Sequence, residues 1–362
     1  MNRLKDKRIK GAVSVGLKQV CLIIVSLILA SIFLGISGYE PLAIVKGIGE
    51  GLTSDIAGTV RWAAPLILAG LAICVTYKAE VFNLGVDGQL YMGAAAGTAV
   101  ALMLPAKMNG VLASGMVLLA AMAAGALFAM IPALLKVYFG TNEVVSTLLL
   151  NFIAVLYIEY LVTGPMMDKT AGTNLNASAV LPENTWMPRI SFLEPSAANI
   201  GFYIALIMVV IISFVFYKTI LGHEIKIVGS NPVFAKYAGM KPKKTIIQVM
   251  AISGALAGMI GGIEVMAVQH RLLAGFNPDF GFDGIVVSLL ANNNPIGVVF
   301  SGIFFGALKN GGINMERLTD VPSAVTEIVM AIIIITISAK FVIPRLKRKP
   351  AVAKNDQIEG GE

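Results

Sequence analysis

Polar side chains interrupt an otherwise apolar chain in four short stretches. These are VFNLGVDGQLYMGA at 81–94, GTNEVVSTLLLN at 140–151, GFNPDFGFDG at 275–284 and ANNNP at 291–295. Amide and carboxylate side chains can donate or accept hydrogen bonds along a passage for a polar solute. The residues that we expect to line such a passage are Asn83, Asp87, Gln89, Asn142, Glu143, Asn151, Phe276, Asn277, Asp283 and Asn292.

The position of these stretches between apolar runs limits where they can lie. Irregular polar backbone persists at membrane depth only where it is buried in protein or borders a watery cavity, because unsatisfied polar groups in lipid are costly. We therefore expect unpaired amide and backbone groups to face a passage; the alternative is that some stretches are loops at the bilayer surface. The first and third stretches share Phe-Asn followed by Gly-x-Asp-Gly, with a two-residue insertion, which indicates an inverted repeat.

Motifs for catalysis or metal binding are missing from the sequence. It contains no Walker A sequence, no His-Glu-x-x-His motif and no Cys/His cluster. We therefore expect no catalytic residue, no metal site and no cofactor. An ion-coupled transporter would need buried carboxylates, and Glu159, Glu264 and Glu327 lie within or near predicted span ends. No basic partner for them is evident within the spans.

The composition indicates an integral membrane protein. Of the 362 residues, 57% are hydrophobic and 14% are charged, and the mean hydropathy is +0.81, which is too apolar for a soluble protein. The apolar runs predict spans near 20–37, 60–77, 89–105, 110–135, 144–163, 199–217, 245–267 and 322–341. The stretch 282–310 predicts two short helices or a re-entrant hairpin. The expected fold is an all-α membrane bundle of eight to ten transmembrane helices with broken or re-entrant segments.

The placement of lysine and arginine predicts the orientation in the membrane. The chain carries a net charge of +7, and its basic clusters precede the first span, follow the last span and fill 218–244. Basic loops stay on the cytoplasmic side, so all three regions are expected there. The predicted division is a cytoplasmic N-terminus at 1–18, a transmembrane domain at 19–341 with an external loop at 164–198 and a cytoplasmic loop at 218–244, and a cytoplasmic tail at 342–362. Each basic cluster abuts a span, so we expect no nucleic-acid partner.

Small residues recur at four-residue spacing within three of the predicted spans. They are Gly93 and Gly97, then Gly254, Gly258 and Gly262, then Gly302 and Gly306. Such spacing lets helix backbones approach closely where apolar side chains gain little by leaving lipid. It therefore predicts a compact bundle.

The predicted cytoplasmic loop contains a short helix with both ends marked. Asn231 is a good N-cap, Pro232 suits the first helical position, and Gly239 can adopt the left-handed conformation that ends a helix. So short a helix is not stable alone in water. Its apolar face must therefore pack on a partner or on the protein's own surface, and the residues expected on that face are Val233, Phe234, Tyr237 and Ala238.

Residues 222–239 follow the pattern Gly-His-Glu-x-Lys-x-Val-Gly-x-Asn-x-x-x-Ala-x-x-Ala-Gly. This pattern resembles the cytoplasmic coupling segment in the permease subunits of bacterial nucleoside and simple-sugar ABC importers. FNLGVDGQ, TNEVVSTLLLN and GFDGIVVSLL resemble other signatures of that family in the same order, so the similarity extends over about 59–340. The first signature is most like the nucleoside branch. One departure is Ala291-Asn-Asn-Asn, where the family usually has a glycine-containing turn.

The resemblance implies a permease subunit that takes up nucleosides across the bacterial plasma membrane as a multi-pass protein with cytoplasmic termini. It implies no enzyme activity, because a separate ABC ATPase subunit hydrolyses ATP. The other implied partners are a second permease, often a different chain, an extracytoplasmic substrate-binding lipoprotein, the nucleoside and membrane lipid. The residues implied in ATPase coupling are Gly222, Glu224, Gly229, Asn231, Pro232, Phe234, Ala235, Tyr237 and Gly239. The alternatives are the same role for a simple sugar, or an ion-coupled secondary transporter.

Overall fold

The computed structural model describes residues 24–42, 46, 47, 49, 50, 53–168, 176–193 and 196–318, with single positions between 322 and 336. The predicted segments 1–18 and 342–362 lie outside the described residues. The predicted span at 322–341 is described only at single positions, so its extent stays a prediction.

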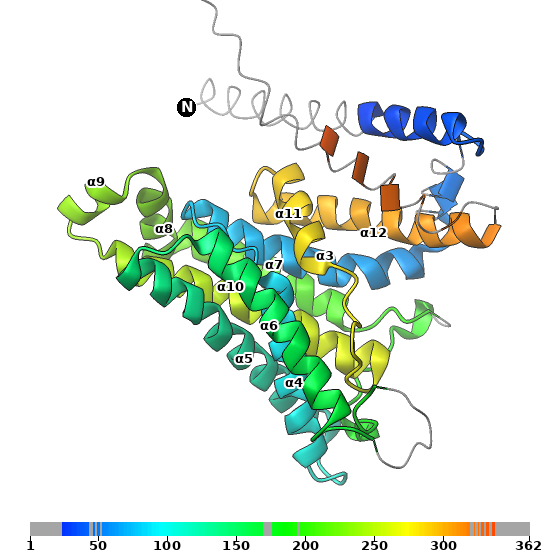
Figure 1. Ribbon diagram of the computed structural model, residues 1–362, viewed down its shortest axis with the longest axis horizontal. Coiled ribbons are helices and arrows are strands. Elements are labelled where there is room, and N and C mark those ends of the chain that lie inside the picture. The colour runs from blue at the N-terminus through cyan, green and yellow to red at the C-terminus, as the bar shows by residue number, and fades with distance from the viewer. Residues whose placement is uncertain are drawn as a thin grey trace, which may run out of the picture.

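The described part of the chain is a bundle of α-helices without a β-strand (Figure 1). A short apolar helix, Ile24–Ile36, comes first. The helices after it are α3 (Ile56–Lys78), α4 (Val86–Met103), α5 (Gly110–Phe139), α6 (Glu143–Thr163), α7 (Gly201–Lys218), α8 (Ile220–Ser230), α9 (Pro232–Tyr237), α10 (Pro242–Glu264), α11 (Phe280–Leu290) and α12 (Pro295–Leu318). Within the described residues, α3, α5, α6, α7, α12 and α10 with its extension are long and apolar enough to cross a membrane. The expected all-α membrane fold is confirmed.

The ambiguous stretch at 282–310 forms one short and one long helix. α11 has 11 residues and α12 has 24. The turn between them contains Asn292 and Asn293, both with positive φ, a conformation that asparagine tolerates better than most residues. Pro295 then begins α12 at a position where its missing N–H is harmless.

Burial places α3 and α10 at the centre of the bundle. In their most apolar windows, 78% of α3 and 67% of α10 is buried, against 17% of α6. α3 packs mainly on α12 and α11, while α10 packs mainly on α5 and α4. α3 and α10 thus each pack on the two helices that follow the other one in the chain. The inverted repeat itself stays a prediction.

Glycines make the central helix crossings as close as predicted. A Cβ atom on Gly125 of α5 would lie 2.2 Å from the carbonyl oxygen of Gly254 in α10. A Cβ atom on Gly93 of α4 would lie 2.4 Å from the Cα of Gly258. Both distances are far below van der Waals contact, so these crossings require glycine.

Two irregular segments interrupt the helices on either side of this centre. Residues 79–85 link α3 to α4. A π-helical turn, η3 (Val265–Gln269), extends α10, and residues 270–279 then run without regular structure to α11. These interruptions overlap the first and third polar stretches of the sequence. We call residues 79–89, which include the first turn of α4, the first break, and residues 265–284, which include the first turn of α11, the second break.

Candidate functional site

Three side chains bind one another at the first break. The amide nitrogen of Asn83 donates to Gln89 Oε1 and to Ser253 Oγ, each at 2.9 Å, and Gln89 Nε2 donates back to Asn83 Oδ1 at 2.9 Å. Asn83 and Gln89 are each only 1% exposed. The expectation of unpaired amides is therefore not met at these two positions, because the two amides bind each other and Asn83 also binds Ser253 of α10.

Asn151 supports the same segment from α6. Its Nδ2 donates to the carbonyl of Leu84 at 2.7 Å, and its Oδ1 accepts from the backbone N–H of Gly88 at 2.8 Å. One side chain thus satisfies a donor and an acceptor that the interrupted helix leaves without partners. An amide side chain suits this task because it offers both a donor and an acceptor.

Asp87 joins the first break to the second. Its Oδ1 accepts hydrogen bonds from Asn277 Nδ2 at 2.6 Å and from the backbone N–H of Gly281 at 2.7 Å. Asn277 Oδ1 in turn accepts from the backbone N–H of Phe280 at 3.1 Å, at the start of α11. Two short hydrogen bonds to one carboxyl oxygen thus connect the start of α4 with the segment around 277–281.

Gly281 allows this close approach. A Cβ atom at that position would lie 2.5 Å from Asp87 Oδ2. Beside the junction, the ring of Phe276 meets that of Tyr91 edge to face with centroids 5.2 Å apart. We call the set Asp87, Asn277, Gly281 and their direct contacts the break junction.

Asp283 pairs with a cation that sequence reasoning missed. Its carboxylate forms an ion pair with Lys309 of α12, and Lys309 Nζ also donates to the carbonyl of Pro278 at 3.0 Å. The same ammonium lies 5.5 Å from the ring centroid of Trp62 and 5.6 Å from that of Phe280. A lone lysine within an apolar helix was the available signal, because such a charge needs a partner.

Glu264 also has a basic partner, which corrects the expectation that none lies within the spans. Arg61 NH2 and NH1 donate to its two carboxylate oxygens at 2.7 and 3.1 Å. The two side chains are 13% and 3% exposed, and the guanidinium carbon lies 4.4 Å from the ring centroid of Trp62. Arg61 lies near the start of α3 and Glu264 at the end of α10, so folding alone brings the pair together.

Three predicted pathway residues lie away from the break junction. Asn142 caps α6 by accepting from the N–H of Val144 at 2.9 Å. Glu143 forms an ion pair with Lys136 near the end of α5. Asn292 occupies the turn between α11 and α12. The structure thus gives each of them a capping, pairing or turn-forming position.

The short helix predicted at 231–239 is confirmed. Asn231 Oδ1 accepts from the N–H of Phe234 at 2.9 Å, Pro232 is the first helical residue, and Gly239 has a φ of +81°. Gly222 and Gly229 are buried where α8 packs on α7 and on the end of α3, and Glu224 is half-buried. These contacts anchor α8 and leave α9 projecting from the bundle (Figure 1).

The outer side of α9 is apolar and exposed. Val233, Phe234 and Tyr237 are 62%, 59% and 88% exposed, whereas Ala235 is fully buried. Ala238, the fourth residue of the predicted apolar face, is exposed as well, so the alternative in which that face packs on the protein's own surface is not met. Large exposed apolar side chains on a short helix outside a bundle are typical of a docking surface.

The other end of the bundle ties the predicted external loop to the second break. The backbone N–H of Ser178 donates to the carbonyl of Leu272 at 2.9 Å, and that of Leu181 to the carbonyl of His270 at 2.9 Å. The rings of Trp186 and His270 stack with centroids 3.9 Å apart. Burial lowers the pKa of His270 below its ordinary value, which favours the neutral ring in this stack.

Comparison with known proteins places the chain among permeases. Residues 56–338 match the family described as branched-chain amino acid transport system / permease component. The guanosine ABC transporter permease protein NupP of Bacillus subtilis is 35% identical over 91% of this chain and 96% of its own length. The nucleoside ABC transporter permease protein NupB of Lactococcus lactis is 32% identical, over 88% of this chain and 87% of its own.

A sugar permease is similar as well. The glucose ABC transporter permease protein TsgB13 of Haloferax volcanii is 38% identical over 79% of this chain and 77% of its own length. No solved structure matches the chain. The matched residues include both breaks, α8 and α9, so the similarity covers the helix bundle and its candidate sites. The chain belongs to the family of branched-chain amino acid transport system permease components.

Proposed function

We propose that the chain is the permease subunit of an ATP-binding-cassette importer that carries a nucleoside across the bacterial plasma membrane. The similarity to a guanosine permease and a nucleoside permease, each over most of both chains, supports this proposal. So does the bundle, which brings two broken segments together at Asp87. This contact between the two breaks is the observation that carries the proposal, because irregular backbone among membrane helices must be buried in protein or line a watery cavity.

The break junction is the proposed point of solute passage. Asp87, Asn277, Phe276 and Asp283 are the pathway residues that lie at or beside it. Asn83, Gln89 and Asn151 support the first break through their hydrogen bonds. An uncharged solute can form hydrogen bonds with the amides and carboxylates there and then dissociate, because it forms no ion pair with them.

The source of energy is a separate ATPase subunit that docks on α9. When two ATPase subunits below the permease close on each other, they move α9. α8 then transmits this motion to the bundle through its contacts with α7, α10 and α3. Such a shift requires that the ATPase binds the two states of the permease differently. The other proposed partners are a second permease, often a different chain, and an extracytoplasmic binding lipoprotein that meets the loop around 176–193. Both termini and α9 are then cytoplasmic.

A simple sugar is the second candidate solute. It is favoured by the 38% identity to a glucose permease. A sugar and a nucleoside share a hydroxylated ring, and the break junction offers groups for hydroxyls in both cases. The nucleoside differs from the sugar by its planar base.

Uptake by reconstituted vesicles tests the proposal. The permease would be reconstituted with an ATPase, a second permease and a binding protein from the same organism, and accumulation of labelled guanosine and glucose would be followed with and without ATP. ATP-dependent accumulation of guanosine supports the proposal, and accumulation of glucose alone supports the sugar. Uptake that needs no ATPase but follows an imposed proton gradient would refute an importer of this class.

A further inference from the structure

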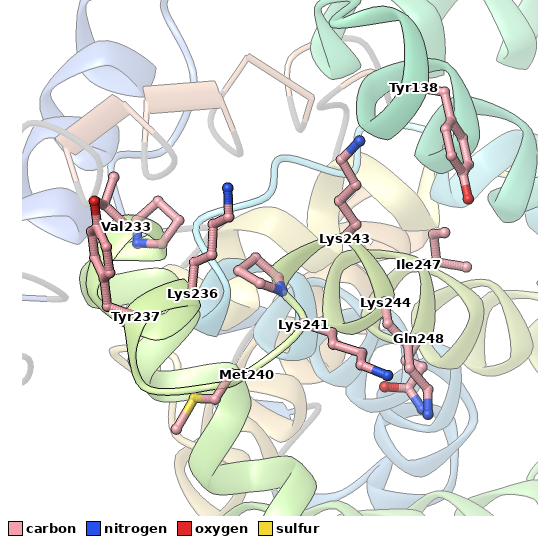
Figure 2. Close-up of a pocket in the computed structure, with 12 residues that line it drawn as sticks. Tyr138, Val233, Lys236, Tyr237, Met240, Lys241, Lys243, Lys244, Ile247 and Gln248 are labelled. Carbon is pink, nitrogen blue, oxygen red and sulfur yellow. The ribbon is translucent and has the colours of Figure 1, made fainter.

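A pocket of about 1010 Å³ lies beside α9 (Figure 2). α9 borders it on one side with Val233 and Tyr237, and Tyr138 at the end of α5 borders the other side. Between them lie Met240 and the first turns of α10, including Ile247. The pocket therefore combines an apolar floor with an aromatic side chain at each edge.

Four lysines surround this pocket: Lys236, Lys241, Lys243 and Lys244. All four are exposed, and within the part of the chain that the structure describes none of them has an acidic partner. Lys243 makes only a contact with the ring of Tyr138, at 5.4 Å from the centroid. By contrast, Lys136 near the end of α5 is paired with Glu143.

We propose that this pocket receives an acidic and partly apolar segment of the ATPase subunit. This inference rests on the proposed function, in which α9 docks on the ATPase, and it adds the chemistry of the partner's surface. Charge complementarity selects carboxylates, because four unpaired ammonium groups share one rim. The apolar floor selects a segment that also carries at least one apolar side chain.

The shape of the surface gives the same assignment. α9 is a ridge with exposed Phe234 and Tyr237, and the pocket is the groove directly beside it. An ATPase subunit that encloses this ridge in a cleft must place one wall of the cleft in the groove. We expect that wall to carry the carboxylates.

The test compares the wild-type permease with two variants in nanodiscs, using the purified ATPase. Lys243→Gln/Lys244→Gln removes two rim charges, and Lys218→Gln removes an exposed lysine at the end of α7 that does not line the pocket. We expect the double variant to weaken ATPase binding roughly five- to tenfold, as two exposed ion pairs would. Its binding should also depend less on salt concentration, whereas Lys218→Gln should behave like wild type.

A zero-length carbodiimide cross-linker provides a second readout. It joins lysines to carboxylates in contact, and mass spectrometry would locate the joined residues. Cross-links from Lys241, Lys243 or Lys244 to ATPase carboxylates support the proposal. It is overturned if the double variant binds the ATPase with unchanged affinity and salt dependence while the wild type yields no such cross-link.

The two failures can be told apart. If the wild-type permease does not bind the ATPase at all, the proposed function fails and this inference fails with it. If the ATPase binds all variants equally but native mass spectrometry shows that the double variant alone loses bound phosphatidylglycerol, the pocket holds a lipid headgroup. That result overturns the acidic segment and leaves the proposed function standing.

Discussion

Asn277 donates a hydrogen bond to Asp87 across 2.6 Å and thereby joins two breaks that lie 190 positions apart in the sequence. The same carboxylate oxygen accepts from the backbone of Gly281. The two contacts connect the first turn of α4 to the segment that leads into α11 and to the first turn of α11. Segments from the two halves of the chain thus share one polar junction.

An exchange of the two side chains tests the pair. Asn277→Asp places two carboxylates in contact, so uptake and the melting temperature should fall; a lost hydrogen bond to a charged group costs about 1.5–3 kcal/mol. Asp87→Asn/Asn277→Asp restores one amide and one carboxylate and should recover much of both. Uptake assays and thermal unfolding in nanodiscs measure this. An exchange variant as impaired as the single variant would show that the contact itself is unimportant.

The buried pair of Arg61 and Glu264 is expected to stabilise the bundle. Glu264→Gln leaves Arg61 without its counter-charge, and removal of one partner of a buried pair costs about 3–5 kcal/mol. Arg61→Met/Glu264→Leu removes both charges and should regain most of the lost melting temperature. Uptake by either variant should stay independent of an imposed proton gradient. If Glu264→Gln keeps full stability but changes the response to that gradient, Glu264 is an ion-coupling residue.

Phe234 on α9 is expected to bind the ATPase. Burial of a phenylalanine contributes roughly 1.5–3 kcal/mol, and because Phe234 is 59% exposed, about 1–2 kcal/mol remains for docking. Phe234→Asp should therefore weaken ATPase binding by roughly five- to thirtyfold and reduce ATP-driven uptake. Phe192→Asp at the opposite end, where Phe192 is 77% exposed, is the matched control. Equal ATPase recovery with both variants would exclude α9 as the docking helix.

The orientation in the membrane can be read by cysteine labelling. Phe192 and Tyr237 are 77% and 88% exposed, whereas Ser178 is fully buried and hydrogen-bonded and is a poor site for a reagent. In a background without Cys21 and Cys74, an impermeant maleimide should label Phe192→Cys in intact cells. Tyr237→Cys should react only in inverted vesicles. The reverse pattern would place α9 outside.

Local chemistry was readable from the sequence because each signal depends on a few neighbouring residues. Apolar runs of sufficient length predicted α3, α5, α6, α7 and α10, five of the six helices within the described residues that are long and apolar enough to cross a membrane. α4, predicted as a span at 89–105, is not among the six. Asn231, Pro232 and Gly239 predicted both ends of α9 because caps act within one turn. The motifs in their order also carried the resemblance to the permease family, which the comparison confirmed.

The tertiary structure alone decided which polar groups meet. Arg61 and Glu264 are 203 positions apart, and Asp87 and Gly281 are 194 apart, so no local pattern could pair them. The same holds for the amides of Asn83 and Gln89, which were expected to be unpaired and instead bind each other, with Asn83 also bound to Ser253. In a membrane bundle a polar side chain takes whichever partner the packing supplies, because lipid offers none. The sequence thus determines which polar side chains are present. The helix crossings determine which of them pair, because they bring distant residues within hydrogen-bond distance.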